Sequence, residues 1–261
     1  MAQTAWPLVQ RGFGETARRD FWWVQPLVVF LALSAFILYA TWAAFQGNHY
    51  EHGPYLSPFY SPLLFGEGPH AWFGPKPGWW PAALPFSAAL LILWAPGGFR
   101  FTCYYYRGAY YKAFWQDPTA CTVGEPRASY WGERWFPLVL QNAHRYFLYL
   151  ALIFTVILTY DAIKSFQFAD GLGIGVGSIV ITLNTALLTG YTFSCHSLRH
   201  LVGGRKDEAS KNAVTWGCYT ACSAMNRKHQ VFAWLSLVSV GFADLYVRLC
   251  SMGVWTDFRL L

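Results

Sequence analysis

Long apolar stretches alternate with short polar ones along the chain. Five stretches hold about 20 mainly apolar residues each, the length that a helix needs to cross about 30 Å of hydrocarbon. They cover residues 26–46, 81–106, 136–160, 173–202 and 229–252. The pattern therefore predicts an all-α, polytopic membrane protein, in which five transmembrane helices form a single domain over residues 1–261.

Proline and glycine mark interruptions in this pattern. Pro96, followed by two glycines, predicts a kink in the second helix because proline cannot donate a helical hydrogen bond. Residues 47–80 are rich in proline and glycine and are expected to form an outer loop. Gly217 and the polar run 226–229 predict a break before the fifth helix. The segment ahead of that break is interpreted as an amphipathic stretch on the membrane surface.

Composition supports a membrane protein. The chain of 261 residues is 55% hydrophobic and only 12% charged, whereas soluble domains carry about 25% charged residues. Aromatic residues make up 20% of the chain, and Trp and Tyr concentrate at membrane interfaces. An ordinary soluble protein and a nucleic-acid-binding protein are therefore both disfavoured.

The distribution of Lys and Arg predicts the orientation, because these residues accumulate in cytoplasmic loops. Of the 19 basic residues, 14 fall on one side if the N-terminus is inside. The outer side would hold four, and Arg145 lies within the third helix. The outer four are Lys76, Lys164, Arg248 and Arg259. The sequence thus predicts an inside N-terminus and an outside C-terminus.

Cysteine and histidine gather at the predicted inner ends of the helices. Ionisable residues inside a membrane are costly and usually mark function. The group comprises Cys103, His144, Cys195, His196, His200 and His229. In contrast, the outer halves of the predicted helices contain no histidine, and His49, His52 and His70 of the outer loop lack tight metal-ligand spacing.

Three kinds of metal site would suit such a group. A b-type haem needs two histidines on facing helices, and a Rieske-type [2Fe–2S] cluster needs two cysteines on one iron and two histidines on the other. A structural zinc ion would take Cys₂His₂. The four residues Cys103, Cys195, His144 and His229 match the count for the cluster. His196 and Cys222 are the first alternatives, and Cys218 also competes.

Several chain segments resemble the single-chain, five-helix membrane anchors of bacterial succinate dehydrogenase, respiratory complex II. The segments are "CYYYRGAYYKAFW", "YWGERWFPL", "LQNAHRYFLYL", "SCHSLRHLVGGR" and "NRKHQVFAW". Anchors with two haems carry histidine in the outer part of the bundle, and this chain has none there. It is therefore similar to the haem-less branch, for which a membrane-embedded Rieske-type cluster is implied.

The resemblance implies a multi-pass subunit of the bacterial inner membrane, in the respiratory chain and the tricarboxylic acid cycle. A flavoprotein with FAD and an iron–sulfur subunit with further clusters would dock on its inner face. Electrons would reach a quinone, menaquinone, whose head group is expected near Arg145, Tyr106, Arg199 and His200. A haem b anchor of fumarate reductase, a cofactor-free scaffold and a transporter remain alternatives, and assembly into a higher oligomer stays open.

Overall fold

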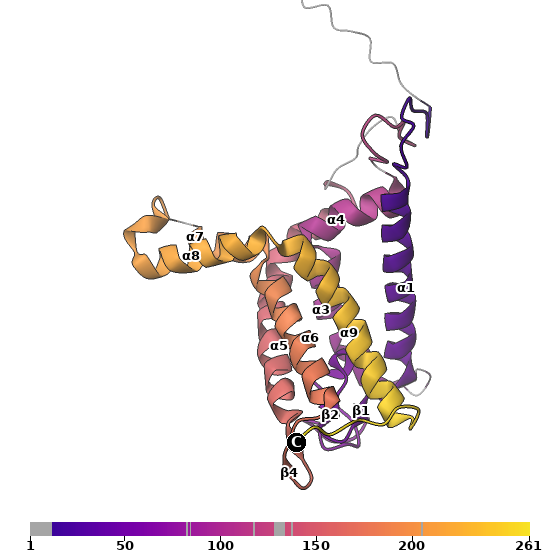
Figure 1. Cartoon of the computed structure of the whole chain (residues 1–261), viewed down its shortest axis with the longest axis vertical. Coiled ribbons are helices and arrows are strands. Elements are labelled where there is room, and N and C mark those ends of the chain that lie inside the picture. Colours follow the sequence, from indigo (N-terminus) through magenta and orange to yellow (C-terminus); the bar gives the residue numbers. More distant parts are fainter. Residues whose placement is uncertain are drawn as a thin grey trace, which may run out of the picture. The chain divides into compact units, whose positions relative to one another are not determined.

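A computed structural model describes residues 12–81, 83, 85–116, 118–127, 134–136, 138–204 and 206–261. Helices dominate this part of the chain (Figure 1). The described α-helices are α1 (Val24–Gln46), α2 (Ala88–Ile92), α3 (Trp94–Phe101), α4 (Tyr104–Tyr110), α5 (His144–Lys164), α6 (Val176–Phe193), α7 (His196–Gly203), α8 (Ala213–Asn226) and α9 (His229–Ser251).

Shorter elements connect these helices. Two antiparallel hairpins join β1 (Glu51–His52) to β2 (Tyr55–Leu56) and β3 (Gln167–Phe168) to β4 (Gly171–Leu172). Short 3₁₀ or π turns occupy Pro58–Tyr60, Tyr111–Trp115, Leu138–Ala143 and Ala209–Lys211. The protein is thus mostly helical, as the apolar pattern predicts.

Four described helices are long and apolar enough to cross a membrane. They are Val24–Gln46, Val139–Lys164, Val176–Phe193 and His229–Ser251, so four of the five predicted spans each overlap one such helix. The predicted helix at 81–106 is instead divided among α2, α3 and α4. The first break is at Leu93, one turn before Pro96, where the proline ring meets the preceding carbonyls.

The predicted helix at 173–202 is also divided. It ends as α6 at Phe193 and resumes as α7 at His196, because Cys195 has an extended backbone with φ −65° and ψ 137°. Beyond it, α8 continues through Gly217, and the expected break occurs at Arg227 and Lys228. Cys218 and Cys222 therefore do not share a continuous helix with His229.

The chain divides into two compact units. The first comprises residues 1–35 and 101–142. Within it, the amide of Gly14 donates to the carbonyl of Gly124 at 3.0 Å, and the rings of Phe30 and Phe114 lie 4.9 Å apart. The segment before α1 is therefore held against the loop that follows α4.

The second unit comprises residues 36–100 and 143–261. Here α6 packs against both α5 and α9. The loop after α1 folds back into the unit, where the Tyr60 hydroxyl donates to the carbonyl of Ala43 at 2.9 Å. A buried apolar cluster surrounds this contact and includes Leu56, Phe59, Leu63, Ala88, Ala89 and Val240. The loop thus contributes buried side chains to the core and does not lie only on the surface.

Hydrogen bonds hold the C-terminal tail against the N-terminal end of α6. The Asp257 carboxylate accepts hydrogen bonds from Tyr55 at 2.7 Å, from Tyr246 at 2.6 Å and from the amide of Gly177 at 2.9 Å. Since Gly177 lies in the first turn of α6, this carboxylate satisfies an amide that has no partner within the helix. An Arg259–Asp170 ion pair of 2.5 Å adds a second, more exposed attachment.

Candidate functional site

Three predicted ligands lie at helix ends in the second unit. His144 and His229 are the first residues of α5 and α9, and Cys195 directly precedes α7. His144 Nε2 lies 3.1 Å from Cys195 Sγ. His229 Nδ1 lies 2.7 Å from the hydroxyl of Ser194, the residue next to Cys195. The structure therefore brings both histidines to the interruption between α6 and α7.

Two aromatic side chains hold the imidazole rings. Phe99 stacks on His144 with a centroid distance of 4.8 Å and an interplanar angle of 5°. Tyr191 stacks on His229 at 5.1 Å and 15°, and its ring meets Phe99 edge-on at 5.4 Å. His144 is buried and His229 is half-buried. The stacking fixes the planes of both imidazole rings.

The turn at Ser194 is itself held in place. The Ser194 hydroxyl donates to the carbonyl of Tyr191 at 3.0 Å, and the Asn226 side chain donates to the carbonyl of Ser194 at 2.8 Å. These bonds satisfy polar groups that the break in the helix would otherwise leave without partners. They also tie the end of α8 to the end of α6.

Cys103 belongs to the first unit. Its side chain is buried, and it directly precedes α4 with φ −61° and ψ 131°, nearly the backbone conformation of Cys195 before α7. The N-terminal end of a helix favours negative charge, including that of a thiolate. Both predicted cysteine ligands thus occupy the same local setting.

The residues predicted to bind a quinone have diverse surroundings. Arg145 and His200 are exposed, whereas Tyr106 is buried in the first unit. The Arg199 guanidinium lies 5.6 Å from the ring of Tyr219, so it is engaged between α7 and α8.

The alternative ligands are placed less favourably. His196 and His200 face one another with 2.9 Å between their Nε2 atoms, but both are exposed. Cys222 lies on α8, where it is half-buried. All six cysteines lie in the described part of the chain, and none forms a disulfide. Among the described residues, no group of three or more histidine, cysteine or acidic side chains is arranged to hold a metal ion.

Arg100 was not predicted as part of this region. Its guanidinium lies 4.6 Å from the ring of Tyr191 and donates to Ser236 at 2.9 Å and to the carbonyl of Ala233 at 3.3 Å. The charge count included Arg100 with the inner loop after the second helix and the flanks of that loop, although the residue falls within the predicted helix 81–106. Its position in that helix could have identified Arg100 from the sequence, because an arginine inside an apolar helix needs polar partners.

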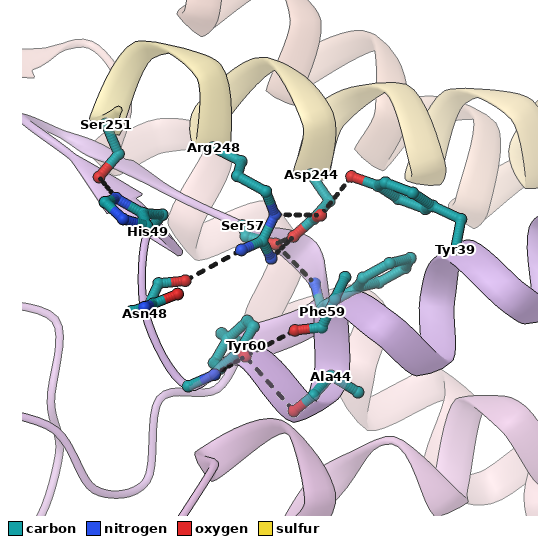
Figure 2. A network of polar contacts seen from close by, with 12 residues as sticks. Tyr39, Ala44, Asn48, His49, Ser57, Phe59, Tyr60, Asp244, Arg248 and Ser251 are labelled. Carbon is teal, nitrogen blue, oxygen red and sulfur yellow. Dashed lines mark hydrogen bonds and ion pairs between the residues drawn. The ribbon is translucent and has the colours of Figure 1, made fainter. Parts of the chain in front are cut away.

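A second polar site lies towards the other end of α9 (Figure 2). Asp244 and Arg248 are fully buried and form an ion pair with two contacts of 3.3 Å. The carboxylate also accepts a hydrogen bond from Tyr39 at 2.6 Å and one from Ser57. Arg248 further donates to the carbonyl of Asn48 at 3.0 Å. Every partner belongs to the second unit.

This network corrects the charge count. Arg248 was assigned to the outer side, but it is an internal residue of α9 and is neutralised by Asp244. Opposite charges four residues apart in an apolar helix were the signal that identifies such a pair. Arg11 and Arg205, counted on the inner side, lie outside the described residues.

The comparisons agree with the resemblance. The chain matches the family model described as actinobacterial succinate dehydrogenase subunit SdhC over residues 24–253. A solved chain of the Mycobacterium smegmatis Sdh1 complex in the apo form is 44% identical, with 94% of each chain covered and a TM-score of 0.86. A search of curated proteins finds no match. The chain therefore belongs to the actinobacterial SdhC family, as a multi-pass inner-membrane subunit of succinate dehydrogenase that is not catalytic alone.

Proposed function

We propose that this subunit anchors the flavoprotein and iron–sulfur subunits of succinate dehydrogenase and passes electrons from succinate to a quinone, menaquinone. The flavoprotein would carry FAD, and the iron–sulfur subunit would dock on the basic inner face. The contact of Cys195 with His144, beside His229, is the observation that carries the electron-transfer part of the proposal.

The donor set fits a Rieske-type [2Fe–2S] cluster in its chemistry. Cys103 and Cys195 would be thiolate ligands, and His144 and His229 would be neutral imidazole ligands. Both cysteines are 2% exposed and directly precede a helix, and a thiol that coordinates a metal ion loses its proton. When bound, such a cluster carries one electron at a higher potential than a cluster with four cysteines.

Residues around the two histidines would position the imidazole rings in this proposal. Phe99 and Tyr191 hold the two imidazole planes. The Ser194 hydroxyl orients His229 through its Nδ1 atom, in the way that a neighbouring hydrogen bond orients a metal-ligating histidine. Arg100 brings a positive charge against Tyr191.

Cysteine substitution tests the cluster. Cys195→Ser and Cys103→Ser should each abolish the membrane cofactor's EPR signal, while the signals of FAD and of the soluble clusters persist. Cys250→Ser is the matched control, because Cys250 is also 2% exposed but belongs to the last turn of α9. A haem b site requires only histidines, so an unchanged signal in assembled Cys103→Ser complex would refute the cluster as assigned.

The quinone head group is proposed to bind near Arg145, Tyr106, Arg199 and His200. These side chains supply hydrogen-bond donors, and apolar helix surfaces would accept an isoprenoid tail. Arg145→Leu should lower quinone reduction by succinate without lowering reduction of a soluble dye. Lys164→Leu, at the other end of α5, is the control. Equal loss of both activities in Arg145→Leu would indicate failed assembly and remove support for this site.

The proposed topology has five crossings, with the N-terminus inside and the C-terminus outside. The predicted span at 81–106, which contains α2 and α3, would be the fifth crossing. The distribution of Lys and Arg supports this orientation, and more so once Arg248 is removed from the outer group. A reporter fused after Leu261 should be active on the outer side. A cytoplasmic signal from a correctly inserted fusion would contradict the orientation.

A further inference from the structure

Helix α8 is unusual because it is uncharged and almost unburied. Its 14 residues include no Asp, Glu, Lys, Arg or His, and none of them is buried. At about 1.5 Å per residue the helix is about 21 Å long, too short to span about 30 Å of hydrocarbon. An exposed apolar helix that is too short to span the membrane needs another apolar environment to cover it.

The direction of α8 indicates what covers it. Figure 1 shows α7 and α8 running across the direction of α5, α6 and α9, all within the second unit. If the long helices cross the membrane, the pair formed by α7 and α8, here called the arm, lies along its surface. The arm leads directly into α9 through Arg227 and Lys228.

One face of α8 is apolar over its whole length. Val214, Cys218, Ala221 and Met225 follow one another at four- and three-residue steps and so share this face. Val214 is 74% exposed, and Cys218 and Ala221 are also exposed. Met225 instead lines an open apolar cavity of about 710 Å³, together with residues of α5 and α6 and with Phe232. The face is therefore directed to the side on which the spanning helices lie.

Basic residues flank this apolar face. Between residues 196 and 228 the sequence has six Lys and Arg against two acidic residues. Lys211 precedes α8, Arg227 and Lys228 follow it, and Lys206 donates to Thr215 in its first turn at 2.7 Å. Trp216 is 47% exposed and stacks on Tyr219, as expected for an aromatic residue at a membrane interface.

We propose that the arm is a binding surface for anionic phospholipids. The apolar face of α8 lies in the upper acyl layer, and the cations at its two ends contact phosphate groups. An uncharged helix with basic ends suits this environment, because burial of apolar area and attraction to anionic headgroups act together. A protein partner would have to bring a matching apolar surface to the same side as the spanning helices.

The native Cys218 thiol is a probe of this face. In nanodiscs, which leave both membrane faces open, Cys218 should react with a membrane-impermeant maleimide on the order of tenfold slower than with N-ethylmaleimide, because the charged reagent does not enter the acyl layer and the neutral one does. Asp207→Cys, in the polar connection between α7 and α8, is the control and should react readily with both. Mass spectrometry identifies the labelled peptide.

Three further measurements separate the possible coverings. Protection of Cys218 should persist after chaotropic removal of the soluble subunits, and protection lost at that step would show that a partner subunit covers α8. A Cys218–Cys218 crosslink would show contact with a second copy. In phosphatidylcholine nanodiscs, protection should be weaker than with added phosphatidylglycerol, and Lys211→Gln combined with Arg227→Gln should remove that difference. Protection independent of lipid charge would overturn the proposal.

Discussion

The buried Asp244–Arg248 pair makes a sharp prediction about stability. Arg248→Met leaves the Asp244 carboxylate, which is 0% exposed, without its cation. Two donors remain, Tyr39 at 2.6 Å and Ser57, whereas both guanidinium contacts are lost. Removing one partner of a buried pair costs about 3–5 kcal/mol, and the remaining donors place this substitution near the lower end, about 3 kcal/mol.

The reciprocal substitution should cost at least as much. In Asp244→Asn, the neutral amide oxygen at position 244 can still accept from Arg248, whose other described partners are the carbonyl of Asn48 and the ring of Trp42, 5.2 Å from its Cζ atom. None of these groups carries a negative charge, so the guanidinium remains inside the protein without a counter-ion. We therefore expect about 4–5 kcal/mol of destabilisation, near the upper end of the range.

Thermal unfolding of the purified complex in detergent measures both effects, with loss of monodisperse protein as the readout. A cost of about 3–5 kcal/mol corresponds to a fall in midpoint on the order of 10 °C. Arg259→Gln is the control, because its ion pair with Asp170 is exposed and such pairs contribute less than about 1 kcal/mol. If Arg248→Met lowers the midpoint no more than Arg259→Gln does, the network does not stabilise the fold as argued.

Two further predictions concern packing and pH. Gly98→Ala should destabilise the protein by about 1–3 kcal/mol and so lower its melting temperature, because a Cβ at this position meets the ring of Phe147. Gly97→Ala is the control, because a Cβ at Gly97 has open space around it. Burial raises the pKa of the Glu51 carboxyl, while His70 lowers it. Glu51→Gln should therefore raise the melting temperature at neutral pH, and the gain should vanish below the unfolded pKa of about 4.5. A gain that persists at pH 3, or a Gly98→Ala midpoint equal to that of Gly97→Ala, would contradict the respective argument.

The sequence predicts most of what hydrophobicity controls. Four of the five predicted spans coincide with long helices, because a stretch of about 20 apolar residues has few alternatives to a membrane helix. The concentration of Cys195, His144 and His229 at helix ends also identified residues that lie close together. Polar groups within a membrane pair with one another because an isolated one is costly, and the role of these three residues as metal ligands stays a prediction.

The break between α6 and α7 was not predictable in the same way. Nothing in "FSCHSL" signals the interruption at Ser194 and Cys195, since neither residue type forces a helix to end. It is stabilised by tertiary bonds from Asn226 and His229, which lie more than 30 residues away. The buried Asp244–Arg248 pair, by contrast, had a local signal in the spacing of its charges, and only the assignment of Arg248 to the outer side concealed it.

The polar sites at His229 and at Asp244 of α9 should differ in function. His229 and Asp244 are 15 residues apart, about 22 Å along the helix axis. The Asp244 site is closed, with each charge met by described partners, so its replacement by apolar residues should be tolerated. Asp244→Leu combined with Arg248→Met removes both charges and costs mainly the acceptor of Tyr39 and Ser57, about 1 kcal/mol for each hydroxyl. The double variant should therefore be more stable than either single variant and should keep any cofactor signal of the Cys195 region unchanged. A stable double variant that lost that signal would show that the two ends of α9 are coupled, and that the ion pair serves electron transfer as well as the fold.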